Sequence, residues 1–227
     1  MNPPRPKTPL LALALATSLA PIGCGDQAPP ATDRLVVVDG IEIRLAEVEP
    51  YVQFLDSFIP EGGRKTKIRR VLEEQVLPLR LAQRAFASKR REQLDRALAL
   101  CTVATNVAEL EAQTKVFEDK TSKKVSRMQA KLPVAMFLFD ELKVGSVSAP
   151  LEVPFGYIVA GCRGLETSAV ALDDAADALQ IGFATHPAAE WQSWIDAERK
   201  RVASLVTYVH PDYRDAMPAW LQLPRLP

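Results

Sequence analysis

The side chains most often used for catalysis are few and scattered in this sequence. It contains two histidines, His186 and His210, and three cysteines, Cys24, Cys101 and Cys162. No CxxC pair and no Cys/His cluster is present, so the ligand spacing of a zinc or redox site is missing. Neither histidine accompanies a recognisable nucleophile motif, and no phosphate loop or dinucleotide fingerprint occurs. We therefore expect no metal, no cofactor and no catalytic residue of these classes.

One stretch carries a specific pattern. Residues 134–162 read VAMFLFDELKVGSVSAPLEVPFGYIVAGC. This run resembles the second half of parvulin-type peptidyl-prolyl isomerases, where a helix leads into L-K-x-G-x-V-S-x-P and then P-F-G-Y-H. The matching residues are Leu142, Lys143, Gly145, Val147, Ser148, Pro150, Pro154, Phe155, Gly156 and Tyr157. Strand alternation predicts that Phe155 and Tyr157 share one face and that Gly156 and Ile158 share the other.

Two departures from the family pattern bear on catalysis. Ile158 stands where the family has a histidine, and isoleucine neither donates a hydrogen bond nor titrates. The strand with the first histidine and the Gly-rich segment have no counterpart between residues 114 and 132. Catalysis of X-Pro rotation, with a barrier of about 20 kcal/mol, requires a pocket that encloses the proline. We expect a truncated, two-stranded segment over 133–165 without the opposing wall of that pocket, and little or no isomerase activity. The resemblance leaves Phe155 and Tyr157 as candidate client-binding residues.

The N-terminus has the features of an export signal. Arg5 and Lys7 precede the apolar run LLALALATSLA at 10–20, which is about half the length needed to span a bilayer. Cys24 follows Gly23 and resembles the lipidated cysteine of bacterial lipoproteins, although Pro21 replaces the usual leucine. We expect a signal peptide at 1–23, lipidation of Cys24 and a flexible tether at 24–34. The alternative is an ordinary secretory signal with an incidental cysteine.

Both readings place the mature chain outside the cytoplasm, at the periplasmic or cell-surface side of a bacterial membrane. Exported chains meet oxidants, so Cys101 and Cys162 either form a disulfide or stay free, and the sequence leaves both open. The chain has 28 basic and 28 acidic residues, so it lacks the net positive field that attracts nucleic acid. We expect no nucleic-acid partner.

The remaining pattern predicts a helical domain that begins with a hairpin. Asp39-Gly40 between two β-rich runs is typical of a two-residue hairpin turn. Helices are predicted around Val48–Ile59, with Pro50 in the first turn, and around Ile68–Phe86, with a kink at Pro78. A third helix is predicted from the stripe Leu94, Leu98, Cys101, Thr105, Ala108 and Ala112. Residues 117–132 are expected to be a linker or solvated helix end, 173–183 and 188–203 helices, and SLVTYVH at 204–210 a strand.

This order of elements resembles exported foldases and chaperones of the SurA and PrsA type. The expected fold is α+β and mainly helical, with a SurA-like domain at 35–116 and 172–210, a truncated parvulin-like segment at 133–165 and a Pro-rich tail at 211–227. The resemblance implies a membrane-anchored, chaperone-like protein that binds unfolded or extended protein clients. Two alternatives remain: an active prolyl isomerase, and a structural envelope lipoprotein that binds one fixed partner.

Overall fold

The structure is a computed structural model that describes residues 33–117, 119–140 and 143–224. The predicted signal peptide, Cys24 and nearly all of the tether lie outside these residues, as do Leu142 and the last three residues of the tail. The described residues belong to one compact unit. Its α+β composition agrees with the predicted fold class. Among the described helices, none combines the length and the apolar character that crossing a bilayer requires.

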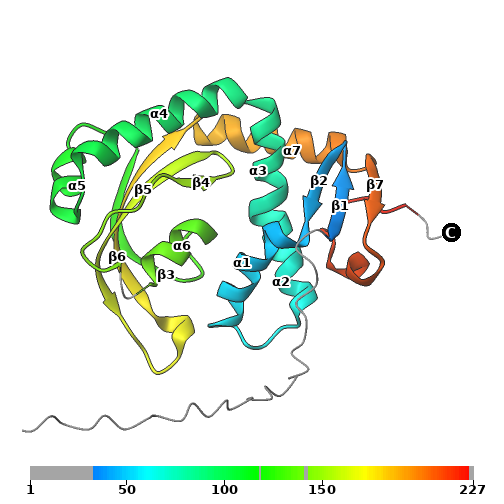
Figure 1. Ribbon diagram of the computed structural model, residues 1–227, viewed down its shortest axis with the longest axis horizontal. Helices are drawn as coiled ribbons and strands as arrows, with labels where there is room; N and C mark the ends of the chain where they lie inside the picture. The colour runs from blue at the N-terminus through cyan, green and yellow to red at the C-terminus, as the bar shows by residue number, and fades with distance from the viewer. Residues whose placement is uncertain (1–32, 118, 141–142, 225–227) are drawn as a thin grey trace, which may run out of the picture. The chain divides into compact units, whose positions relative to one another are not determined.

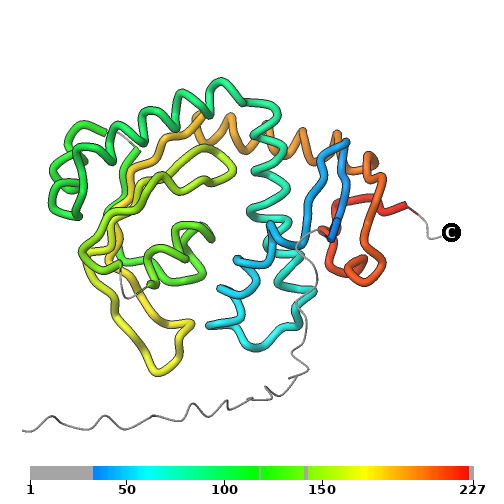
Figure 2. The backbone as a smooth tube through the Cα atoms, in the orientation of Figure 1, coloured from blue at the N-terminus to red at the C-terminus, as the bar shows by residue number. Residues whose placement is uncertain are grey.

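The chain begins and ends in the same small sheet. Strands β1 (Arg34–Val38) and β2 (Ile41–Arg44) form the predicted hairpin, with positive φ at Asp39 (50°) and Gly40 (74°). Strand β7 (Val206–Val209) pairs antiparallel with β1, which gives the order β2-β1-β7. Figure 2 shows these two ends of the described chain side by side. The expected union of hairpin and C-terminal strand is therefore confirmed.

The first helices follow the predicted apolar spacing, with two differences in detail. Helix α1 (Leu45–Asp56) begins earlier than expected, and Glu47 caps its start by accepting a hydrogen bond from the Arg44 amide at 3.0 Å. Pro50 therefore lies inside the helix and not in its first turn. Helices α2 (Arg64–Val71) and α3 (Leu77–Ala85) flank a π-helical turn, Leu72–Val76. The sequence predicted a kink at Pro78, which lacks an amide proton, and the structure has this π-helical turn just before that residue.

A four-stranded antiparallel sheet replaces the expected two-stranded remnant. Its strands are β3 (Lys120–Ser126), β4 (Leu151–Val153), β5 (Gly156–Glu166) and β6 (Ala175–Ala184), in the order β3-β6-β5-β4. Helix α6 (Leu132–Leu138) covers one face, and helices α4 (Ala87–Val103) and α5 (Val107–Gln113) cover the other (Figure 1). The sheet thus has a separate apolar core on each side.

Two secondary-structure predictions are wrong in this sheet. Residues 117–132, expected to be a linker, contain β3, in which only Val125 is buried because an edge strand is largely solvated. Residues 173–183, expected to be helical, contain β6, which is hydrogen-bonded on both sides by β3 and β5. Alanine and leucine favour a helix locally, but pairing on two sides overrides that preference.

The stripe predicted for the third helix is only partly buried. Helices α4 and α5 divide it, and Leu98 is 46% exposed. The buried face of α4 is formed instead by Arg90, Gln93, Ala97 and Leu100. Two polar side chains therefore occupy positions that an apolar pattern does not reveal.

The last helix connects the two sheets. Helix α7 (Ala188–Val202) starts just after β6 and leads to β7, and short 3-10 turns lie at Ala171–Asp173 and Pro211–Ala216. Cys162 belongs to the core under α6, whereas Cys101 packs against the core under α4. Both cysteines are free, because the sheet separates the two cores that contain them.

Candidate functional site

The candidate site is built around the tight turn between β4 and β5. Val153 pairs with Gly156, so Pro154 and Phe155 form the two residues of the turn. Gly156 has φ +154°, and a Cβ atom at this position would lie 2.1 Å from the Phe183 carbonyl oxygen. Only glycine therefore lets β5 begin this close to β6.

The backbone of Phe155 is held by Thr185, the residue that follows β6. Its carbonyl oxygen accepts hydrogen bonds from the Thr185 amide at 2.9 Å and from the Thr185 hydroxyl at 3.1 Å. His186 extends this contact, since its Nδ1 lies 3.1 Å from the Thr185 hydroxyl and its Nε2 lies 3.0 Å from Lys89 Nζ. A lysine ammonium only donates, so Nε2 accepts and Nδ1 carries the proton that bonds to Thr185. The chain of hydrogen bonds runs from Lys89 on α4 to Phe155.

A buried arginine holds the same turn from the other side. Arg90, 3% exposed, donates to the carbonyl oxygens of Pro154 at 2.8 Å and Val153 at 3.1 Å. It also forms an ion pair with Glu152 at 2.9 Å, and its guanidinium lies 5.2 Å from the centre of the Tyr157 ring. Because the guanidinium presents several donors in a fixed plane, one side chain satisfies most of the carbonyl groups of the turn.

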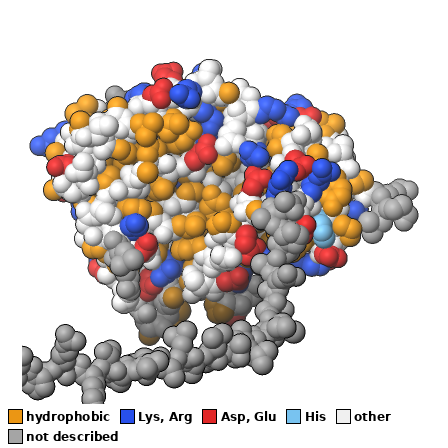
Figure 3. Space-filling view, in the orientation of Figure 1, with side chains coloured by type: hydrophobic (Ala, Val, Ile, Leu, Met, Phe, Trp, Pro, Cys, Tyr) orange, Lys and Arg blue, Asp and Glu red, His pale blue; other side chains and the backbone are white. Residues whose placement is uncertain are grey.

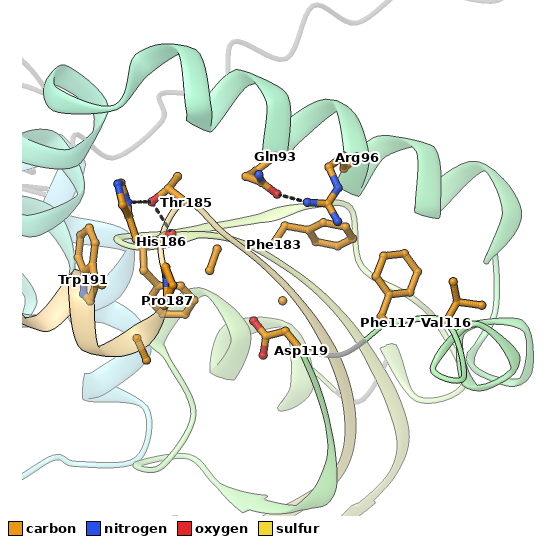
Figure 4. Close-up of a pocket in the computed structure, with 14 residues that line it drawn as sticks. Gln93, Arg96, Val116, Phe117, Asp119, Phe183, Thr185, His186, Pro187 and Trp191 are labelled. Atoms are coloured by element: carbon orange, nitrogen blue, oxygen red, sulfur yellow. Dashed lines mark hydrogen bonds between the residues drawn. The ribbon is translucent and has the colours of Figure 1, made fainter.

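A large pocket lies beside Phe155, between α4, the end of β6 and the start of α7. Its volume is about 890 Å³, within the usual range for ligand pockets. In Figure 4, Gln93 and Arg96 project from α4 toward the pocket, and Phe183, Phe117 and Asp119 lie below them. Four aromatic residues contribute to its lining: Phe117, Phe155, Phe183 and Trp191.

Two smaller hollows adjoin this pocket at Phe155. One, of about 260 Å³, extends toward α7 and is lined by Gln75, Met128, Lys131 and Trp191. The other, of about 220 Å³, lies on the sheet face beside α6 and is lined by Thr121, Lys123, Ile158 and Gln180. Phe155 lines all three hollows. We call the three together the Phe155 groove.

The structure separates the two predicted client-binding residues. Phe155 is half-buried and packs on the α6 side of the sheet with Ile158, whereas Tyr157 packs on the α4 side with Phe183. The predicted alternation is wrong because Phe155 belongs to the turn and not to the strand. Tyr157 is 8% exposed, and burial raises the pKa of its phenol. It supports Arg90 from within the core, and only Phe155 faces the groove.

The segment expected to stand without further strands is instead extended by β6 and β3 of the same sheet. Thr121, Lys123 and Val125 of β3, together with Gln180 and Gly182 of β6, line the hollow that contains Phe155 and Ile158. No pattern in the sequence indicates this lining, because β3 and β6 are brought together only by long-range pairing. Phe117 and Phe183 were not predicted as pocket-lining residues for the same reason, since a linker was predicted for 117–132 and a helix for 173–183.

The groove offers a largely apolar and aromatic binding surface. Its histidine, His186, has its two ring nitrogens in hydrogen bonds to Thr185 and Lys89. No cluster of three or more potential metal ligands occurs in the part of the chain that the structure describes. Comparisons of this chain with protein-family models, with characterised proteins and with solved structures found no match.

Proposed function

We propose that this protein is a chaperone-like binder of unfolded or extended polypeptide segments, which it holds in the Phe155 groove. The observation that carries the proposal is the meeting of three hollows at one half-buried aromatic side chain. Aromatic residues bury a large apolar area and have few rotatable bonds, so they bind varied apolar side chains at low entropic cost. A groove that continues on both sides of Phe155 suits an extended polypeptide segment that lies across this side chain.

The surface around the groove is consistent with this use. Figure 3 shows hydrophobic side chains in patches across the middle of the face presented in Figure 1, with charged side chains around them. Val116 is 77% exposed and Val103 is 56% exposed, and both lie near Phe117 on the adjoining surface. Exposed apolar area of this kind is typical of a surface that binds other proteins.

The proposal includes export and anchoring. The predicted signal peptide and Cys24 support a lipid-anchored protein at the outer side of a bacterial membrane, where unfolded exported chains are present. Since a single acyl chain gives only reversible membrane binding, a lipoprotein-type anchor with more than one chain is the form we propose.

Client binding is tested with a reduced, carboxymethylated model protein that cannot fold. The Phe155→Ala variant should bind it roughly tenfold or more weakly, the loss typical of a central aromatic contact. Tyr208→Ala is the matched control, because Tyr208 lies in β7 of the other sheet. Circular dichroism confirms that both variants fold. Equal binding by the parent protein and the folded Phe155→Ala variant would refute the role of the groove.

A second candidate function is prolyl isomerisation. The observation in its favour is the 220 Å³ hollow, which has Phe155 and Ile158 together on a four-stranded sheet. Against it, Ile158 contributes no polar group to the twisted amide, and the polar groups that line this hollow are amides, a hydroxyl, lysines and Asp119. We therefore propose that isomerase activity has been lost.

A proline-peptide assay run beside an active parvulin separates the two functions. We expect no turnover above the uncatalysed rate, and no rescue by Ile158→His. One positioned histidine contributes roughly 100- to 10,000-fold only when its neighbours hold the substrate against it. Turnover by the parent protein that disappears in Phe155→Ala would establish an isomerase in place of a binder.

A further inference from the structure

The charges that line the Phe155 groove are unbalanced. Lys123 and Lys131 both line the 220 Å³ hollow, and both are exposed. Arg96 lines the 890 Å³ pocket and donates to Gln93 at 2.9 Å. Among the residues that the structure describes, no carboxylate lies within 4.0 Å of these three cationic groups. Elsewhere many exposed cations are paired, such as Lys124 with Glu166 at 2.5 Å.

The other charged residues of the groove do not offset this positive charge. Glu74 pairs with Arg70 at 3.1 Å, and Arg199 lies 4.0 Å from Asp196. Asp119 is the carboxylate that remains, at the border between the 890 Å³ and 220 Å³ hollows. Its side chain packs against Gly182, where a Cβ atom would lie 2.3 Å from Oδ2. The described lining therefore has three unpaired cations against one carboxylate.

The positive charge and the apolar floor lie in the same hollow. Phe155 and Ile158 supply apolar surface there, and Lys123 and Lys131 supply flexible ammonium groups beside it. A ligand with a buried apolar side chain next to a carboxylate complements both features. Ammonium groups on flexible stems reach carboxylates of varied position, which suits clients of varied sequence.

We propose that the groove prefers client segments in which an apolar residue is flanked by aspartate or glutamate side chains. This inference rests on the proposed function and names its client class. Side-chain carboxylates are favoured over a free chain end, because the hollows continue on both sides of Phe155 and a segment passes through them. Lys123 and Lys131 are specificity residues in this scheme, and Phe155 supplies most of the affinity.

The experiment measures binding of fluorescent twelve-residue peptides by anisotropy. The peptides share an apolar centre and blocked termini, and carry glutamate, glutamine or lysine at two flanking positions. At low salt we expect the glutamate peptide to bind roughly threefold to tenfold more tightly than the glutamine peptide, the effect of two exposed ion pairs. The preference should shrink with added salt because exposed charges are screened. A glutamine peptide with a free C-terminal carboxylate tests whether a chain-terminal carboxylate alone produces the tighter binding.

Variants assign the preference to residues. The double variant Lys123→Gln, Lys131→Gln should bind the glutamate and glutamine peptides equally and leave glutamine-peptide binding unchanged. Lys124→Gln is the matched control, since Lys124 lies on the same strand but points to the opposite face and pairs with Glu166. It should keep the full preference.

The outcomes distinguish this inference from the function on which it rests. Phe155-dependent binding without a glutamate preference overturns the client class and leaves the binding function intact. A preference that survives in the double variant, or that only the free chain end produces, also overturns it. If no peptide binds and the unfolded model protein does not bind either, both proposals fall.

Discussion

Removing the guanidinium of Arg90 should destabilise the protein and disorder the turn that presents Phe155. Arg90→Met keeps most of the volume of the side chain and removes every donor. The side chain is 4% exposed, so water cannot replace the lost bonds to the carbonyl oxygens of Pro154 and Val153. Buried carbonyl groups without a donor cost about 1–3 kcal/mol each.

The magnitude follows from these contacts. Glu152 is 37% exposed, so water resolvates its carboxylate and its lost ion pair adds little. Two unpaired carbonyl groups predict a loss of about 2–6 kcal/mol, and the lost contact with the Tyr157 ring adds to it. Arg90→Lys should recover only part of this, because an ammonium lacks the planar set of donors.

Urea unfolding followed by tryptophan fluorescence measures the effect, and client binding under native conditions measures the state of the turn. Arg91→Met is the matched control, since Arg91 is the next residue of α4, is 78% exposed and pairs only with Asp95 at 3.6 Å. Its effect should stay within about 0.5 kcal/mol. Equal stability of the Arg90→Met and Arg91→Met variants would show that the buried guanidinium does not hold the turn.

Three further predictions concern other parts of the chain. Gly156→Ala should lower the free energy of unfolding by at least about 2 kcal/mol because its Cβ would meet the Phe183 carbonyl at 2.1 Å, whereas Gly164→Ala, with no atom within 4 Å, should change it little in the same urea experiment. Hydrogen bonds from the Ser168 amide and from Arg127 lower the pKa of Asp174 in the folded protein. The stability that this carboxylate contributes is therefore fully present above its unfolded pKa of about 3.9 and is lost as the pH falls through the lower folded pKa. Asp174→Asn should therefore be less stable than the parent at neutral pH, and the gap should close below about pH 4; a gap independent of pH would contradict this. Cys24→Ala should move the protein from the membrane to the soluble fraction on cell fractionation, and an unchanged distribution with unchanged gel mobility would contradict lipidation.

Local signals predicted the local parts of this fold. Asp39-Gly40 predicted the hairpin because both residues tolerate positive φ, and both adopt it. The apolar spacing of Val48, Val52 and Leu55 predicted the buried face of α1. The likeness of Pro154–Tyr157 to a family motif drew attention to Phe155, although the strand predicted for this residue is a turn between β4 and β5.

Long-range pairing could not be predicted from the same signals. Strand β3 carries three lysines and one buried valine, a composition typical of solvated segments. Strand β6 contains the helix-favouring run AADAL. Strand β3 forms because β6 supplies its hydrogen-bond partners, and β6 forms because β3 and β5 supply its partners; all of these partners lie far away in the sequence. The groove shares this origin, since its walls come from α4, β3, β6 and α7.

The position of Phe155 shows why a motif recognised from sequence is not yet a site. The turn residues themselves give no orientation for the ring, and simple alternation assigned it to the same face as Tyr157. The backbone of its turn is held by Arg90 from a helix more than sixty residues earlier and by Thr185, which follows β6 thirty residues later. In the sequence Arg90 belongs to the charged run KRRE, where a solvated role is the ordinary interpretation. Its burial against the carbonyl oxygens of the turn makes it a positioning residue, and through it the helical part of the chain determines how the aromatic ring faces the groove.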